Sequence, residues 1–260
     1  MPKILCLHGF VQNGSVFAKK SSALRKALAK AGYETVYLTA PVKIDTADLP
    51  FEPTTLGGES GNDAAVDAFR SWWPANEQKD DYYTLDQAFA CVKQSVQENG
   101  PYDGVLGFSQ GAGFAGILCT VIHKLHELVP EQAGSEEYKQ KNIPLKFGIF
   151  YSGFRVKPDA LQHFYTPPIS TPSLHILGAL DTVVSEERSM ALYNACSPES
   201  RTLLTHPGGH FVPNSKPMVA SVVNFITTQP ANDVPENTSE KTPAAAPSED
   251  WSLFDKIGQA

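Results

Sequence analysis

Residues 107–111, Gly-Phe-Ser-Gln-Gly, place a serine between two glycines in the pattern Gly-x-Ser-x-Gly. The apolar run 102–106 before it predicts a strand, and the run 112–118 after it opens a predicted helix. A serine at such a strand-to-helix turn has a strained backbone and close neighbours, which explains the flanking glycines. The pattern therefore predicts Ser109 as a nucleophile, and the alternative is a helix-capping serine in a glycine-rich turn.

A serine hydroxyl becomes a good nucleophile only when a base takes its proton, and this motif requires an acid and then a histidine further along the chain. Asp181 comes directly after the predicted strand 173–178, which is the usual position of such an acid. An aspartate at that place also suits a helix start or a turn, and Glu186 and Asp159 are weaker candidates. We therefore predict that Asp181 orients the base.

The base is expected in residues 206–211, His-Pro-Gly-Gly-His-Phe, between the last predicted strand and the last predicted helix. His206 lies at the strand end and is followed by a proline, whereas His210 follows two glycines that let the loop turn back over the sheet edge. His210 is therefore the predicted base, and His206 is the alternative. Ser109, Asp181 and His210 then form the predicted catalytic triad.

Hydrolysis through a tetrahedral intermediate also needs hydrogen-bond donors for the oxyanion. The backbone N–H of Gln110, directly after the nucleophile, is one expected donor. The second is expected from the loop after the first strand, where Gly9 lets the chain turn and the Phe10 N–H can face the site. We interpret His8 as a residue that organises this loop and not as a second base.

Short apolar runs alternate with segments of helical periodicity from the start of the chain to about residue 228. Strands are predicted at 3–8, 34–39, 103–107, 145–151, 173–178 and 201–205, and helices at 15–31, 84–98, 110–127, 185–195 and 216–228. Right-handed crossovers place connecting helices on the faces of a parallel sheet, so this order predicts an α/β fold. We expect about six mostly parallel strands with helices on both faces.

The composition divides the chain into three parts. Residues 1–228 are predicted to form the catalytic domain. Residues 229–250 are acidic and rich in proline, which is typical of a disordered linker. Residues 251–260 are predicted to form a short amphipathic segment, and two interpretations stay open: it docks on the catalytic body or on a partner, or it is a frayed tail. The apolar residues at helical spacing in this segment are Trp251, Phe254 and Ile257.

The stretch 42–83 is the longest break between predicted elements. A break of this length inside a domain is usually functional, and we interpret it as a lid or pocket wall. Its large apolar side chains are Leu49, Phe51, Leu56, Phe69, Trp72 and Trp73. Two interpretations stay open for the tryptophans, which either line an acyl pocket or pin the insertion to the sheet.

The composition also limits the partners of the chain. A length of 260 residues exceeds the roughly 100 to 200 of a typical domain, but one α/β unit can hold it. The net charge of −7, without a Lys/Arg cluster, argues against nucleic acid. No membrane-length apolar run or secretory signal is found, so we expect a cytoplasmic protein.

Four scattered cysteines and the pair His123 and His126 do not fit a zinc site, so we expect no metal and no cofactor.

Three stretches resemble the fungal family of serine hydrolases, which has animal relatives among candidate tumour-associated esterases. They are Leu-His-Gly-Phe-Val-Gln-Asn-Gly at 7–14, Asn-Gly-Pro-Tyr-Asp-Gly running into Gly-Phe-Ser-Gln-Gly-Ala at 99–112, and His-Pro-Gly-Gly-His-Phe-Val-Pro at 206–213. The resemblance spans about residues 3–228. It implies an α/β-hydrolase with its triad on Ser109, Asp181 and His210, and a similarity to acyl-protein thioesterases and carboxylesterases.

These observations favour an enzyme that cleaves a small-molecule acyl ester or thioester through an acyl-enzyme. The alternative is a non-catalytic binding protein on the same fold, because a fold does not determine a function. All three triad residue types and both glycines of the Gly-x-Ser-x-Gly pattern are present, which favours the enzyme.

Overall fold

The computed structural model describes residues 1–45, 69–74, 85–129 and 140–229. They belong to one of two units of the chain, Met1–Pro230, and the other unit, Ala231–Ala260, lies outside them. The predicted linker 229–250, apart from Gln229, and the predicted segment 251–260 therefore fall outside the described residues. The same holds for Leu49, Phe51 and Leu56 of the predicted insertion.

Six parallel strands form the central sheet in the order β2-β1-β5-β6-β7-β8. Their bounds are β1 Lys3–Leu7, β2 Glu34–Leu38, β5 Gly104–Phe108, β6 Phe147–Tyr151, β7 Ser173–Gly178 and β8 Arg201–His206. Strands β5 and β6 are buried along their whole length, as expected where helices cover both faces of a parallel sheet. The prediction of a six-stranded, mostly parallel α/β fold is confirmed.

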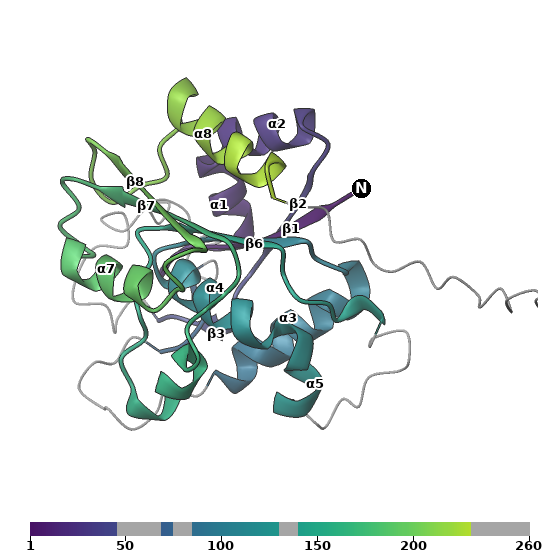
Figure 1. Cartoon of the computed structure of the whole chain (residues 1–260). Coiled ribbons are helices and arrows are strands. Elements are labelled where there is room, and N and C mark those ends of the chain that lie inside the picture. The colour runs from purple at the N-terminus through teal and green to yellow at the C-terminus, as the bar shows by residue number, and fades with distance from the viewer. Residues whose placement is uncertain (46–68, 75–84, 130–139, 230–260) are drawn as a thin grey trace, which may run out of the picture. The chain divides into compact units, whose positions relative to one another are not determined.

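Helices cover both faces of this sheet (Figure 1). On one face lie α1 Gly14–Lys20, α2 Ser22–Lys30 and α8 Lys216–Thr227, and on the other lie α3 Asp86–Asn99, α4 Gln110–Val121 and α5 Leu125–Leu128. The remaining helical elements are α7 Glu186–Asn194 and the 3₁₀ helices η4 Ile122–Lys124 and η6 Asp159–Tyr165. Within the described ranges, no helix has both the length and the apolar character needed to cross a bilayer.

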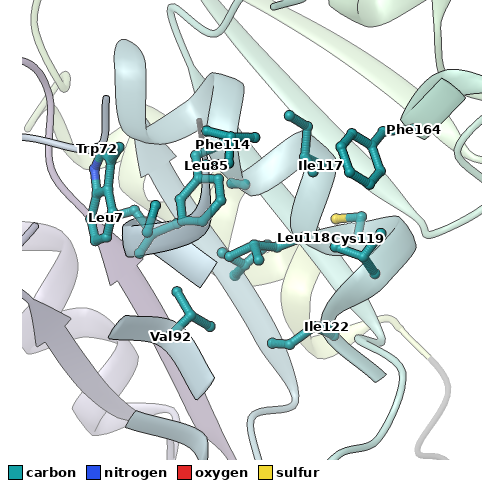
Figure 2. Packing of buried hydrophobic residues seen from close by; sticks show 14 of the residues in the cluster. Leu7, Trp72, Leu85, Val92, Phe114, Ile117, Leu118, Cys119, Ile122 and Phe164 are labelled. Carbon is teal, nitrogen blue, oxygen red and sulfur yellow. The ribbon is translucent and has the colours of Figure 1, made fainter. Parts of the chain in front are cut away.

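Each face of the sheet has its own apolar core, because side chains alternate between the two faces along each strand. On β1, Leu5 and Leu7 point to the side of α3 and α4, while Ile4 and Cys6 point to the side of α1, α2 and α8. The core around α4 is the one in Figure 2, where Leu7 and Trp72 lie near Phe114. The side chain of Trp72 is fully buried there.

Two predicted helices are shorter than expected. The segment 15–31 is not one helix, because α1 ends at Lys20 and α2 begins at Ser22. Ser21 lies between them, and its hydroxyl donates to the Phe17 carbonyl (2.7 Å) and contacts the Tyr37 hydroxyl (2.8 Å). The predicted helix 110–127 is likewise divided, into α4, η4 and α5.

Two short segments of the predicted insertion 42–83 pair with each other. Strand β3, Val42–Lys43, and strand β4, Arg70–Ser71, form a short antiparallel ladder. The Arg70 N–H also donates to the Gln12 carbonyl (3.1 Å), so β4 is joined to the loop after β1. The described strand β4 of the insertion therefore lies beside the loop that follows β1 at the carboxyl edge of the sheet.

Helix α4 approaches β1 so closely at Gly111 that a Cβ there would lie 2.3 Å from the Leu7 carbonyl oxygen and 2.4 Å from that of His8. At Gly116 of the same helix, a Cβ would meet the flexible end of Leu192 at 2.9 Å. We predict that Gly111→Ala lowers the free energy of unfolding by about 2 kcal/mol or more, since backbone atoms must move. Gly116→Ala is the matched control and should cost less, because Leu192 can shift and alanine favours a helix by up to about 1 kcal/mol over glycine. Urea unfolding measures both variants, and equal losses would contradict the prediction.

Candidate active site

Ser109 lies at the sharp turn between β5 and α4, with a left-handed backbone (φ 53°, ψ −118°) that is rare outside glycine. Its N–H donates to the Tyr151 carbonyl at the end of β6 (2.8 Å), which holds the strained turn in place. A Cβ on Gly107 would lie 2.4 Å from the Gly111 carbonyl oxygen, so the two glycines permit the close packing of strand and helix. The packing reason proposed for the flanking glycines is therefore confirmed.

A chain of two hydrogen bonds connects Ser109, His210 and Asp181. The distance from His210 Nε2 to Ser109 Oγ is 3.0 Å, and that from His210 Nδ1 to Asp181 Oδ2 is 2.8 Å. The side chains of His210 and Asp181 are only 8% and 4% exposed. In the sequence, His210 lies 101 positions from Ser109 and 29 positions from Asp181. The parallel strands bring the three residues to one edge of the sheet.

The loops that carry Asp181 and His210 brace each other. The N–H groups of Ala179 and Leu180 donate to the carbonyls of His206 (2.8 Å) and Gly208 (3.0 Å). The Asp181 N–H donates to the Gly178 carbonyl (3.1 Å), which closes the turn after β7. These backbone contacts set the position of both side chains before any substrate arrives.

Hydrogen bonds keep the Asp181 carboxylate ionised. Burial alone would raise its pKa, but donors from His210 and from the backbone of Val184 outweigh burial and hold the pKa below its ordinary value. Asp181 Oδ1 accepts from the N–H groups of Val183 and Val184, both at 2.9 Å. An ionised carboxylate only accepts hydrogen bonds, so His210 Nδ1 carries a proton toward it. His210 Nε2 is then free to accept the proton of Ser109 Oγ.

The aromatic ring of Phe108 supports the imidazole of His210, with ring centroids 4.7 Å apart. Phe108 is the variable residue before the serine in the Gly-x-Ser-x-Gly pattern. The sequence did not predict its contact with His210, because Phe108 ends β5 whereas His210 lies in the loop after β8.

The alternative candidates lie elsewhere. His206 is buried at the end of β8, where its Nδ1 accepts from the Gly208 N–H (3.2 Å) and burial lowers its pKa. Glu186 and Asp159 are exposed residues at the start of α7 and η6. The hydrogen-bonded chain therefore contains His210 and Asp181 and none of these three.

The loop after β1 lies directly against Ser109. A Cβ on Gly9 would be 3.4 Å from the Ser109 Cβ. A turn from Gly9 to Gln12, closed by the Gln12 N–H and the Gly9 carbonyl (3.3 Å), holds Phe10 and a left-handed Val11 (φ 56°). Gln110 is the first residue of α4, and the first N–H groups of a helix have no acceptor within it. Both predicted oxyanion donors thus lie on segments next to the nucleophile, and their role stays a prediction.

His8 ties this loop to the segment that follows β2, which agrees with its interpretation as a residue that organises the loop. Its Nε2 accepts from the Ala40 N–H (2.9 Å), so its Nδ1 carries the proton and donates to the Gly9 carbonyl (2.8 Å). The ring is fully buried, and mainly for that reason its pKa falls to about 4. His8 is therefore neutral and held by both ring nitrogens.

The side chain of Gln110 fastens the predicted insertion to the turn between β5 and α4. Its Oε1 accepts from the Trp72 N–H (2.9 Å) and its Nε2 donates to the Trp73 carbonyl (3.0 Å). The Trp72 Nε1–H donates in turn to the His8 carbonyl (2.9 Å). Both tryptophans are buried, which supports the interpretation that they pin the insertion. The only signal for Gln110 in the sequence was its place inside the serine motif.

Metal-binding side chains do not gather in the described part of the chain, where no group of three or more His, Cys, Asp or Glu is placed to hold an ion. His126 Nδ1 lies 3.3 Å from the side-chain amide of Asn142. That amide also donates to the His123 carbonyl (2.7 Å), so the segment that carries His123 and His126 is joined to Asn142.

Comparisons with known proteins show the family of the chain. The family model described as serine hydrolase (FSH1) matches residues 1–222. "Family of serine hydrolases 3" of Saccharomyces cerevisiae is 39% identical over 98% of this chain and 92% of its own length. Human "Esterase OVCA2" is 32% identical over 86% of this chain and 95% of its own length.

Solved structures give the same fold at low sequence identity. Zea mays acyl-protein thioesterase 2 superposes with a TM-score of 0.55 at 17% identity, over 87% of this chain and 92% of that one. Esterase PE8 superposes with a TM-score of 0.54 at 19% identity, over 87% and 91%. The fold is that of an α/β-hydrolase. With a family model that spans most of its length and relatives above 30% identity, the chain belongs to the FSH1 family of serine hydrolases.

Proposed function

We propose that the protein hydrolyses carboxylic esters or thioesters through an acyl-enzyme on Ser109. The observation that carries the proposal is the continuous hydrogen-bond chain from Ser109 Oγ through His210 to Asp181. In this series of hydrogen bonds, the Ser109 hydroxyl can give its proton to the imidazole of His210, and the ionised carboxylate of Asp181 accepts from the other ring nitrogen.

In the first half-reaction, Ser109 Oγ forms a bond to the acyl carbon while its proton moves to His210 Nε2. The leaving oxygen or sulfur then takes that proton from His210 as its bond to the acyl carbon breaks. In the second half-reaction, water replaces the serine, and its proton moves to His210 and then to the departing Ser109 oxygen. Asp181 stays ionised and orients the imidazolium that forms in each step.

The oxyanion of each tetrahedral intermediate is assigned to the backbone N–H groups of Phe10 and Gln110. Gln110 lies at the N-terminus of α4, where the helix dipole favours negative charge. Phe10 lies in the turn that packs against Ser109. Because these donors are backbone groups on braced segments, they need little rearrangement during the reaction.

The substrate is proposed to be a small acyl ester or thioester. The name of human "Esterase OVCA2", a relative across most of the chain, supports an ester. Oxygen and sulfur esters share the acyl carbon that Ser109 attacks, so the same site serves both. The net charge of −7 makes nucleic acid a poor partner.

Ser109→Ala and His210→Ala should each lower kcat by about 10³ to 10⁶, because the members of such a chain act as a unit. Labelling by a fluorophosphonate probe should disappear in Ser109→Ala. His206→Asn is the matched control, since asparagine keeps an acceptor for the Gly208 N–H, and it should retain kcat within a few-fold. Measured with p-nitrophenyl acetate, an inactive His206→Asn beside an active His210→Ala would move the base to His206.

Asp181→Asn should leave the fold intact and lower kcat by up to about 10⁴, because an amide favours the wrong tautomer of His210. Glu186→Gln removes a carboxylate that is exposed at the start of α7 and should leave kcat unchanged. Steady-state kinetics and the thermal midpoint of each variant are the measurements. Full activity in Asp181→Asn would show that another group orients the base.

A shared acyl-enzyme predicts that an ester and a thioester of the same acyl group behave alike after the leaving group has departed. With added hydroxylamine, the ratio of hydroxamate to free acid should be the same for the p-nitrophenyl ester and the coenzyme A thioester of one acid. Product analysis measures this ratio. Different ratios would mean that the two substrates do not pass through the same intermediate.

A further inference from the structure

The non-glycine residues with a left-handed backbone lie around the candidate site. In the part of the chain that the structure describes, the non-glycine residues with positive φ are Val11, Ser109 and Ser152 (φ 45°). They follow β1, β5 and β6, which are neighbours in the sheet. Such backbone is unfavourable and persists where the surroundings enforce it, often at functional sites. Val11 and Ser109 already belong to the site, whereas Ser152 has no role in the mechanism above.

Ser152 lies between the strand of the nucleophile and the strand that leads to the acid. It directly follows Tyr151, whose carbonyl accepts from the Ser109 N–H. Its own N–H donates to the Ile176 carbonyl on β7 (2.9 Å), and the turn after β7 carries Asp181. Ser152 is 1% exposed and the Asp181 side chain 4%, so both lie beneath the surface at the ends of adjacent strands.

The hydroxyl of Ser152 is a buried donor beside a charged acceptor. Among the described residues, its geometry falls short of a hydrogen bond, although buried hydroxyls almost always make one. Asp181 accepts from Val183, Val184 and His210, and a carboxylate has about four acceptor sites. Burial, His210 and Val184 have the largest effects on the pKa of Asp181. The Ser152 hydroxyl comes next and lowers this pKa.

We propose that Ser152 is a positioning residue for the Asp181 carboxylate. Its left-handed backbone turns the side chain toward Asp181, and a small rotation about the Cα–Cβ bond of Ser152 moves Oγ into position to give the carboxylate its fourth hydrogen bond. The fourth bond restrains rotation of the carboxylate and keeps Oδ2 aimed at His210 Nδ1. The inference rests on the proposed function, because it assigns Ser152 a part in the same reaction.

A buried residue that acts through Asp181 touches no substrate, so its loss should change kcat and leave KM unchanged. Ser152→Ala removes the hydroxyl and keeps a Cβ, whereas Ser152→Gly removes it and also accepts positive φ without strain. Both variants should lose kcat on the order of tenfold, the worth of one hydrogen bond to a charged group. Ser173→Ala, which removes a fully buried hydroxyl at the other end of β7, is the control and should keep kcat.

The decisive experiment is a double-mutant cycle with Asp181→Asn, followed by kcat and KM for p-nitrophenyl acetate. If Ser152 acts through Asp181, Ser152→Gly should have no further effect on kcat once Asp181→Asn is present. A full additional loss in that background would overturn the proposal, as would a Ser152→Gly variant with the kcat of the wild type. Should Ser152→Ala fail to fold, Ser152→Gly carries the test.

Failure of the proposed function is distinguishable from failure of this inference. A wild-type protein without esterase activity or fluorophosphonate labelling would overturn the proposed function and the role of Ser152 with it. An active wild type whose Ser152→Gly variant is equally active would overturn the inference alone.

Discussion

The close approach of helix α4 to the end of β1 is the constraint on which the site depends. At Gly111 the helix meets the carbonyls of Leu7 and His8 with no space for a Cβ. Beside this contact the chain passes from β5 into α4 through one residue, Ser109, which has a left-handed backbone. The strain is held by the hydrogen bond from the Ser109 N–H to the Tyr151 carbonyl. The same approach sets the loop after β1 against Ser109, so the nucleophile and a predicted oxyanion donor are positioned by one contact.

Parallel topology then brings the remaining groups to the same edge. Because all six strands run in one direction, the segments that follow β5, β7 and β8 emerge side by side. Asp181 and His210 belong to two such segments, which exchange backbone hydrogen bonds through Ala179 and Leu180. The resulting Ser–His–Asp chain is assembled by the sheet and its loops and does not need a bound substrate. This preorganisation is what a site for acyl transfer requires, since the charged intermediates form without costly rearrangement.

A layer of buried polar side chains supports the reacting groups from behind. His8 joins the loop after β1 to the segment after β2, and Gln110 fastens residues 72 and 73 of the insertion to α4. The Trp72 indole closes this arrangement by donating to the His8 carbonyl. Such groups are costly to bury without partners, so their satisfied hydrogen bonds favour one arrangement of the loops over others. Ser152 lies in the corresponding place beneath Asp181.

Local patterns in the sequence were sufficient for the fold class, for all six strands of the central sheet to within two residues at each end, and for the choice of Ser109, Asp181 and His210 as the candidate triad. They sufficed because strand ends, glycine pairs and apolar periodicity are properties of short segments. They also left His206 as an alternative to His210, and they joined α1 to α2, because the separation at Ser21 depends on a contact with Tyr37 on β2. The tertiary structure places His210, and not His206, in hydrogen-bond contact with Ser109 and Asp181, and it revealed the contacts of Gln110, Phe108 and Ser152. These contacts join residues far apart in the chain, and no short-range pattern encodes them, since they exist only once the order of the strands in the sheet is set.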